Sequence, residues 1–206
     1  MSLRAALGVA TVSMLASGAT VSAIITPLMR ADLERATGLA RWPRSDADRA
    51  RFHRPYVIAL AGVSSDFFSV ESVEIITEFR RLELIAEEHA RLNDNFARAG
   101  VGDAEAAIRP WQGLVWISAR LDLTNRTYAG EAPDVGMVIG GTNDQRPVAP
   151  TTARVISRHG SEGELIGWTA DAAFAAPPLK NRRVPILIRF NGRELARFRI
   201  DFAQLD

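Results

Sequence analysis

The chain has 206 residues, of which 47% are hydrophobic and 24% charged, a globular composition that excludes a wholly disordered protein. The formal net charge of +1, with Arg interleaved with acidic residues, gives no reason to expect a nucleic acid partner. The absence of Cys excludes disulfides, thiolate catalysis and Cys-ligated metals, although it does not identify the compartment. All but one of the 25 basic residues are Arg, which we interpret as the mark of a GC-rich bacterial genome.

Residues 1–29 are the first of three expected segments. No charged side chain occurs from Ala5 to Met29, and as a helix this stretch would rise about 37 Å, enough to cross a hydrocarbon core of about 30 Å. The small residues Gly8, Ser17 and Gly18 favour close contact with another membrane helix. The sequence therefore predicts a single-pass signal anchor that contacts the lipid bilayer through residues 5–29.

The same segment also has the pattern of a cleaved signal peptide. Arg4 would supply a short basic start, residues 5–15 an apolar centre, and residues 21–23 a small-residue cleavage site. Cleavage there would leave a mature chain that begins with an apolar run from Ile24, which weighs against it. Both alternatives stay open, and the anchor is the preferred one.

Residues 30–54 form the second expected segment, a polar linker rich in Arg and Asp whose first part, residues 30–40, is compatible with a helix. One interpretation is a juxtamembrane stalk that meets lipid phosphates and places Trp42 at the interface. The other is a solvated linker. The Arg residues that follow the apolar segment predict that the rest of the chain lies in the cytoplasm. The signal-like start favours the periplasm instead, and we retain the periplasm as the expectation.

Residues 55–206 form the third segment, which is predicted to be a mainly β domain with one inserted helix. Apolar residues that recur every three or four positions predict an amphipathic helix over residues 78–98, and a short helical turn is expected between Asp103 and Pro110. The outer face of the helix over residues 78–98 is expected to be solvated. It carries Arg80, Arg81, Glu83, Glu87, Glu88 and Arg91. Strands are expected over residues 56–60, 70–77, 113–123, 135–139, 153–157 and 165–174.

The clearest β signal is the hairpin at Asn191-Gly192, which lies between two alternating runs. The expected register places two sets of apolar residues on one face: Val184, Ile186, Ile188 and Phe190, with Ala196, Phe198, Ile200 and Phe202. Pro185 predicts that the first of these strands lies at a sheet edge, or starts at one. Together the strands predict an antiparallel β-sandwich of the Ig-like kind, in which the helix covers an edge or an open end.

No motif with a chemical mechanism stands out. His53, His89 and His159 are not at metal-ligand spacing from one another or from acidic residues, and the position of His89 predicts a histidine at the edge of the core. Residues 62–66 lack the frame of a nucleophile elbow, and residues 138–147 precede no helix that would cradle a phosphate. We therefore expect no catalytic residue, no cofactor and no metal site.

Aromatic residues are the remaining candidates for an interaction surface: Trp42, Phe67, Phe68, Trp111, Trp116 and Trp168. Trp116 lies on the opposite face of its strand from Val115 and Ile117. It is therefore either available to a partner or covered by the helix.

These observations favour a non-enzymatic accessory or scaffold subunit of the bacterial cytoplasmic membrane. Its periplasmic domain would dock onto a larger integral membrane protein complex. The alternative is a secreted, soluble periplasmic protein that binds a small molecule or a glycan on Trp111, Trp116 or Trp168. A hydrolase is the least favoured function, because its residues would have to come from positions without a motif.

Overall fold

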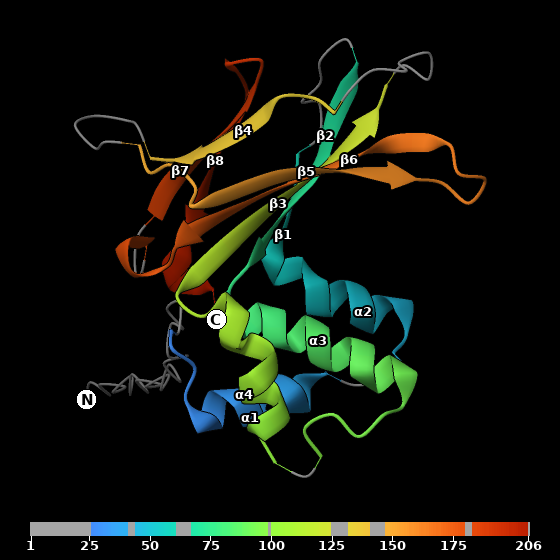
Figure 1. Cartoon of the computed structure of the whole chain (residues 1–206), viewed down its shortest axis with the longest axis vertical. Coiled ribbons are helices and arrows are strands. Elements are labelled where there is room, and N and C mark those ends of the chain that lie inside the picture. The colour runs from blue at the N-terminus through green and yellow to red at the C-terminus, as the bar shows by residue number, and fades with distance from the viewer. Residues whose placement is uncertain are drawn as a thin grey trace, which may run out of the picture.

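The computed structural model describes residues 26–40, 44–60, 67–98, 100–124, 132–140, 147–179 and 183–205. These residues form a mainly β chain with two antiparallel sheets, which confirms the predicted fold class at that level. In Figure 1 the sheets occupy the upper part of the molecule and the helices gather below them. Within the described ranges, no helix is both long and apolar enough to cross a membrane.

The larger sheet has five strands in the order β1-β2-β3-β6-β5. Their bounds are β1 Val57–Ala59, β2 Phe68–Ile76, β3 Leu114–Leu123, β6 Leu165–Ala175 and β5 Thr152–His159. All neighbouring pairs are antiparallel. Burial alternates along β3, where Val115, Ile117 and Ala119 are fully buried, because successive side chains of a strand point to opposite faces.

The smaller sheet has three strands in the order β4-β7-β8, with bounds β4 Val135–Ile139, β7 Arg183–Phe190 and β8 Arg193–Asp201. Asn191 and Gly192 connect β7 to β8 with φ angles of 49° and 75°, as a type I′ turn requires, so the predicted hairpin is confirmed. The predicted register is confirmed for Val184, Ile186 and Ile188, which lie opposite Ile200, Phe198 and Ala196. It is wrong for Phe190, because a bulge after Ile188 sets it opposite Arg193, and Phe202 lies in the 3₁₀ turn after β8.

The position of Pro185 selects one of the two alternatives that the sequence left open. Strand β7 is central, but its pairing with β4 ends at Ile186, which lies opposite Ile139. Pro185 comes one residue before that pair, and its carbonyl accepts a hydrogen bond of 2.8 Å from the Gly140 N–H. Only the start of β7 is therefore at an edge, where the missing N–H of proline removes no bond of the ladder.

One core is formed by side chains from both sheets. Phe68 of β2 packs edge-on against Trp168 of β6, with ring centroids 6.4 Å apart, and against Phe190 of β7, at 4.9 Å. Phe68 and Trp168 are each only 1% exposed. The two residues therefore join the sheets from inside the core.

Four helices accompany the sheets within the described ranges: α1 Arg30–Leu39, α2 Asp46–His53, α3 Glu78–Leu92 and α4 Gly102–Ile108. Helix α3 is shorter than predicted because Asn93 adopts a left-handed conformation and ends it. Helices α1, α3 and α4 share a second apolar core, in which Leu33 and Ala36 of α1 are buried. Helix α1 therefore packs against the body and is not a solvated linker.

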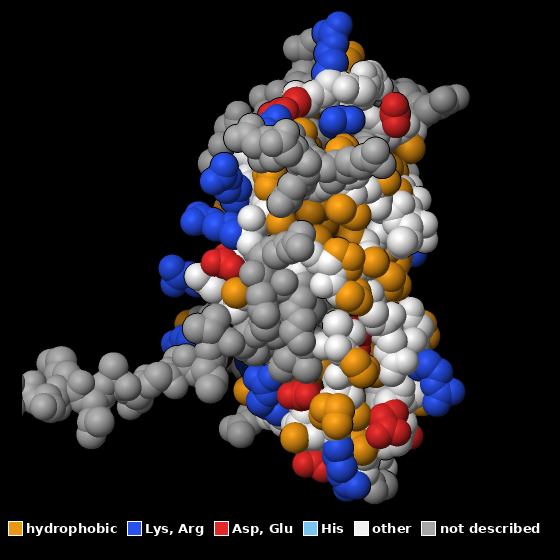
Figure 2. Space-filling model, turned by 90° about the vertical axis from the view of Figure 1, so that its left-hand side faces the viewer, with side chains coloured by type: hydrophobic (Ala, Val, Ile, Leu, Met, Phe, Trp, Pro, Cys, Tyr) orange, Lys and Arg blue, Asp and Glu red, His pale blue; other side chains and the backbone are white. Residues whose placement is uncertain are grey.

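Figure 2 shows the face on the left of Figure 1. Hydrophobic side chains form a band down its middle, and charged side chains of both signs occur at its upper and lower ends and along its left margin, where most are basic. A nucleic acid surface would carry basic side chains over most of such a face. The described side chains here do not form one.

Replacing Gly167 tests the contact between β6 and β3. A Cβ atom at this position would lie 2.0 Å from the Leu121 carbonyl oxygen, a backbone atom that cannot move aside. We expect Gly167→Ala to lower the free energy of unfolding by about 1–3 kcal/mol or more in chemical denaturation.

The matched control is Gly136→Ala in β4, where an added Cβ meets no atom within 4 Å. This variant should change the free energy of unfolding by less than about 1 kcal/mol. Equal losses for the two variants would contradict the packing at Gly167.

Candidate functional site

The main correction concerns the polar face of α3, which the sequence predicted to be solvated. Arg80 is 0% exposed, Glu83 3% and Glu87 8%. Helix α2 and the 3₁₀ turn Arg54–Tyr56 that follows it contact this face through His53 and Tyr56. A buried guanidinium among carboxylates is costly unless each charge is paired, so the pairing around Arg80 decides what this site does.

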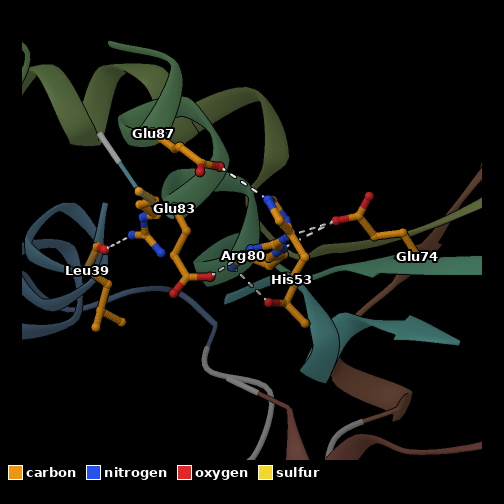
Figure 3. Close-up of polar contacts among 8 residues, drawn as sticks. Leu39, His53, Glu74, Arg80, Glu83 and Glu87 are labelled. Carbon is orange, nitrogen blue, oxygen red and sulfur yellow. Dashed lines mark hydrogen bonds and ion pairs between the residues drawn. The ribbon is translucent and has the colours of Figure 1, made fainter. Parts of the chain in front are cut away.

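Arg80 is the centre of a group that we call the Arg80 cluster: Arg80, Glu74, Glu83, Glu87 and His53 (Figure 3). Its Nε and Nη2 atoms donate to Glu74 Oε1 at 3.3 and 3.1 Å, and its Nη1 donates to Glu83 Oε2 at 3.4 Å. The guanidinium carbon also lies 4.6 Å from the ring centre of Tyr56. One buried cation thus connects β2, α3 and the turn after α2.

His53 closes the cluster from α2. Its Nδ1 contacts Arg80 Nη2, and its Nε2 lies 3.5 Å from Glu87 Oε2. A guanidinium only donates, so Nδ1 is the acceptor and Nε2 carries the proton that faces Glu87. Burial, and secondarily the positive charge of Arg80, lower the pKa of His53, although Glu87 and Glu74 oppose this effect. The imidazole is therefore held in its neutral form.

The Arg80 cluster has the chemistry of a structural clamp. A general base needs a free nitrogen directed at a substrate, whereas both ring nitrogens of His53 are engaged by Arg80 and Glu87. Within the described ranges, no group of three or more His, Asp or Glu residues is placed to hold a metal ion. The cluster instead fixes α2 against α3 and β2.

His89 pairs with an acid, but the pair belongs to the end of α3. Its Nδ1 contacts the Asp94 carboxylate, and its ring stacks on Phe96 at a centroid distance of 4.2 Å. Asp94 also accepts a hydrogen bond of 2.9 Å from the Phe96 N–H. The hydrogen bond from His89 and that from Phe96 lower the pKa of Asp94. These contacts close the turn after the helix, with the His89 side chain 38% exposed at the surface.

A second grouping lies on the outer face of the larger sheet, and we call it the Trp–Arg surface: Arg81, Trp111, Trp116 and Arg154. The Trp111 and Trp116 rings are 5.2 Å apart and inclined by 57°. The Arg81 guanidinium lies 4.0 Å from the centre of Trp111, and that of Arg154 lies 5.3 Å from the centre of Trp116. Burial and the nearby charge of Arg154 lower the pKa of Arg81.

The structure separates the aromatic residues that the sequence proposed for an interaction surface. Trp111 and Trp116 come together on the Trp–Arg surface, and Phe67, just before β2, is 40% exposed. Phe68 and Trp168 are corrected to core residues, because both lie on the inward face of the larger sheet. Trp42, and Gly8, Ser17 and Gly18 of the predicted membrane helix, lie outside the described residues.

In comparisons with known proteins, the chain matches no family model, no curated protein and no solved structure.

Removing the charge of Arg80 tests the clamp. Arg80→Met leaves the Glu74 and Glu83 carboxylates in the cluster without their cation. We expect the free energy of unfolding to fall by about 3–5 kcal/mol, as for other broken buried ion pairs. The control is Arg91→Met on the same helix, whose ion pair with Glu88 is exposed to solvent, and its free energy of unfolding should stay close to that of the wild type. Similar losses of unfolding free energy in both variants would show that the buried ion pairs of Arg80 contribute no more to stability than an exposed pair.

Protonation of His53 should make the protein less stable in mild acid. Because its pKa is lower in the folded chain than the ordinary value of 6.5, the unfolded chain binds the proton more readily. The contribution of neutral His53 to the free energy of unfolding is therefore fully present above a pH of about 6.5. It declines as the pH falls toward the pKa of His53 in the folded chain. Subtracting the unfolding free energies of His53→Gln from those of the wild type across this range should isolate the decline. The matched substitution for comparison is His159→Gln, at the exposed last residue of β5.

Proposed function

We propose that this protein is a non-enzymatic accessory or scaffold subunit, anchored in the bacterial cytoplasmic membrane through residues 5–29. Its periplasmic body docks onto a larger integral membrane protein complex. The Trp–Arg surface carries this proposal, because Trp and Arg are the side chains that most often dominate the binding energy of protein interfaces.

The polar atoms of the Trp–Arg surface also support docking. Arg81 Nε and Trp116 Nε1 are buried donors with no hydrogen-bond partner among the described residues. Arg154 is paired with Asp171 at 3.0 Å, yet its side chain remains 53% exposed. A protein partner that supplies acceptors here would compensate donors that the free chain leaves unsatisfied, after a small rearrangement of the covering side chains.

The last residues of the apolar segment, Thr26 and Leu28, contact the body, which suits a subunit whose body is held close to the membrane surface. Thr26 donates through its hydroxyl to the carboxylate of Glu78 at the start of α3, and Leu28 packs against the helical core. Glu78 Oε1 also accepts a hydrogen bond of 2.6 Å from the Gly113 N–H just before β3. The segment is therefore joined to a helix and to the larger sheet.

We further propose that the two antiparallel sheets form a β-sandwich of the Ig-like kind. The shared core supports this arrangement, since residues of the smaller sheet, among them Ile186 and Ile188, belong to the same apolar cluster as Phe68 and Trp168. The helical layer then covers one open end of the two sheets (Figure 1).

Binding of a glycan or small molecule by a secreted form is the second candidate, and the pairing of Trp111 with Trp116 is the observation that favours it. A sugar ring needs a free aromatic face, whereas guanidinium groups cover one face of each ring, and Trp168 is in the core. A sugar would therefore have to displace these guanidinium groups, whereas docking of a protein does not require their displacement.

The first experiment measures the intact mass of the native protein from the membrane fraction, alongside extraction with carbonate and with detergent. We expect a mass that retains residues 1–29 and release by detergent alone. Ser17→Arg places a charge near the middle of the segment, at a cost of about 2.5–3.5 kcal/mol for insertion, and should shift the protein to the carbonate extract. A soluble chain that begins near Ile24 would overturn the anchor.

The second experiment tests docking. The detergent-solubilised chain should co-purify with a stoichiometric membrane protein complex, and Trp111→Ala should weaken this association by at least about tenfold. Leu92→Ala, at an exposed apolar residue on the end of α3, is the control and should retain it. Thermal unfolding of both variants checks that the fold persists. Unchanged association in Trp111→Ala would exclude the Trp–Arg surface as the docking site.

A further inference from the structure

Strand β5 is an outer strand of the larger sheet with little protection on its free side. Within the described ranges it hydrogen-bonds to β6 alone, so alternate N–H and C=O groups along its eight residues face away from the sheet. Most of its side chains are exposed. Natural proteins usually protect such edges with short strands, prolines or free charges, because an exposed edge recruits another strand.

The charges on β5 do not protect its edge. Arg154 Nε lies 3.0 Å from Asp171 Oδ2 on β6, and Arg158 Nη1 lies 2.6 Å from Asp122 Oδ1 on β3. Both guanidinium groups therefore point across the sheet toward these carboxylates and away from the free edge. Ile156, between them on the same face, is 44% exposed. The strand thus offers an exposed apolar residue and an edge that neither guanidinium group covers.

We propose that β5 pairs antiparallel with β5 of a second copy of this chain, so that the two larger sheets become one continuous sheet. In a pairing with two-fold symmetry, one residue lies opposite its own copy. An axis at Val155 sets Ile156 opposite Arg154 of the other copy, Ala153 opposite Ser157 and Thr152 opposite Arg158. This register uses nearly the whole strand and places no like charges opposite each other.

The neighbouring registers are unfavourable. An axis at Arg154 places this residue opposite Arg154 of the second copy, and an axis at Ile156 places Arg154 opposite Arg158. Both registers are unfavourable, because like charges directly opposite each other destabilise a sheet. Strand β8, the other long outer strand, would also bring like charges together if it paired with its own copy. An axis at Arg197 places this residue opposite its copy, and an axis at Phe198 places Arg197 opposite Arg199. Of these registers, the one at Val155 of β5 is the one that places no like charges opposite each other.

The first test uses two opposite substitutions at Ile156 in the full chain, with the dimer dissociation constant measured by sedimentation in detergent. Ile156→Lys sets a cation against Arg154 twice in each dimer and should weaken pairing on the order of tenfold, whereas Ile156→Glu should strengthen it by a similar factor. Ile156 is exposed, so neither variant should disturb the monomer fold.

The second test is cross-linking, which is clean because the chain has no Cys. Val155→Cys should give a disulfide-linked dimer under mild oxidation, since the Cα atoms of directly opposite residues are about 4.5–5.5 Å apart, within the range that a disulfide spans. Ser157→Cys faces the same side but is displaced from its own copy by roughly 13 Å along the strand and should remain monomeric. A monomeric wild type, a dimer insensitive to both Ile156 variants, or equal cross-linking at residues 155 and 157 would overturn the proposal.

Discussion

The rest of the structure depends on the burial of the Arg80 guanidinium between the helices and the larger sheet. A cation in that place must be compensated from several directions, and the compensating groups come from β2, α2 and α3. Thr77 sets the position of Arg80, because its side chain caps α3 by accepting a hydrogen bond of 3.1 Å from the Arg80 N–H. The start of α3 is thereby fixed relative to the strand before it.

This clamp explains how a polar helix becomes part of the body. Helix α2 has no buried residue of its own, so apolar packing alone would not hold it. It is held by His53 and by the stacking of guanidinium groups on Phe52, from Arg44 at 3.9 Å and from Arg80 at 5.0 Å. Charge pairing and cation–π contacts thus attach α2 to the rest of the chain, whereas α1 and α4 are attached by a hydrophobic core.

The β part of the fold was readable from the sequence because strand periodicity and turn chemistry are local. Asn191 and Gly192 specify a hairpin whatever surrounds them, and the alternation along β3 identifies its buried face. The Arg80 cluster was not readable, because α3 has a polar face of ordinary composition and only the approach of α2 buries it. Trp168 was misassigned although a signal existed: counting by two from Phe174 places it on the inward face of β6.

The proposed docking and self-pairing could use the outer face of the larger sheet together, because three of its arginines already pair with carboxylates within the chain. Arg154 pairs with Asp171, Arg158 with Asp122, and Arg120 with Glu71. A second copy added at the β5 edge extends this face without covering it, since β-strand pairing joins sheets side by side. Two Trp–Arg surfaces would then lie on one continuous sheet, and a partner complex would meet them as a bivalent site with a fixed separation, which binds more tightly than either surface alone.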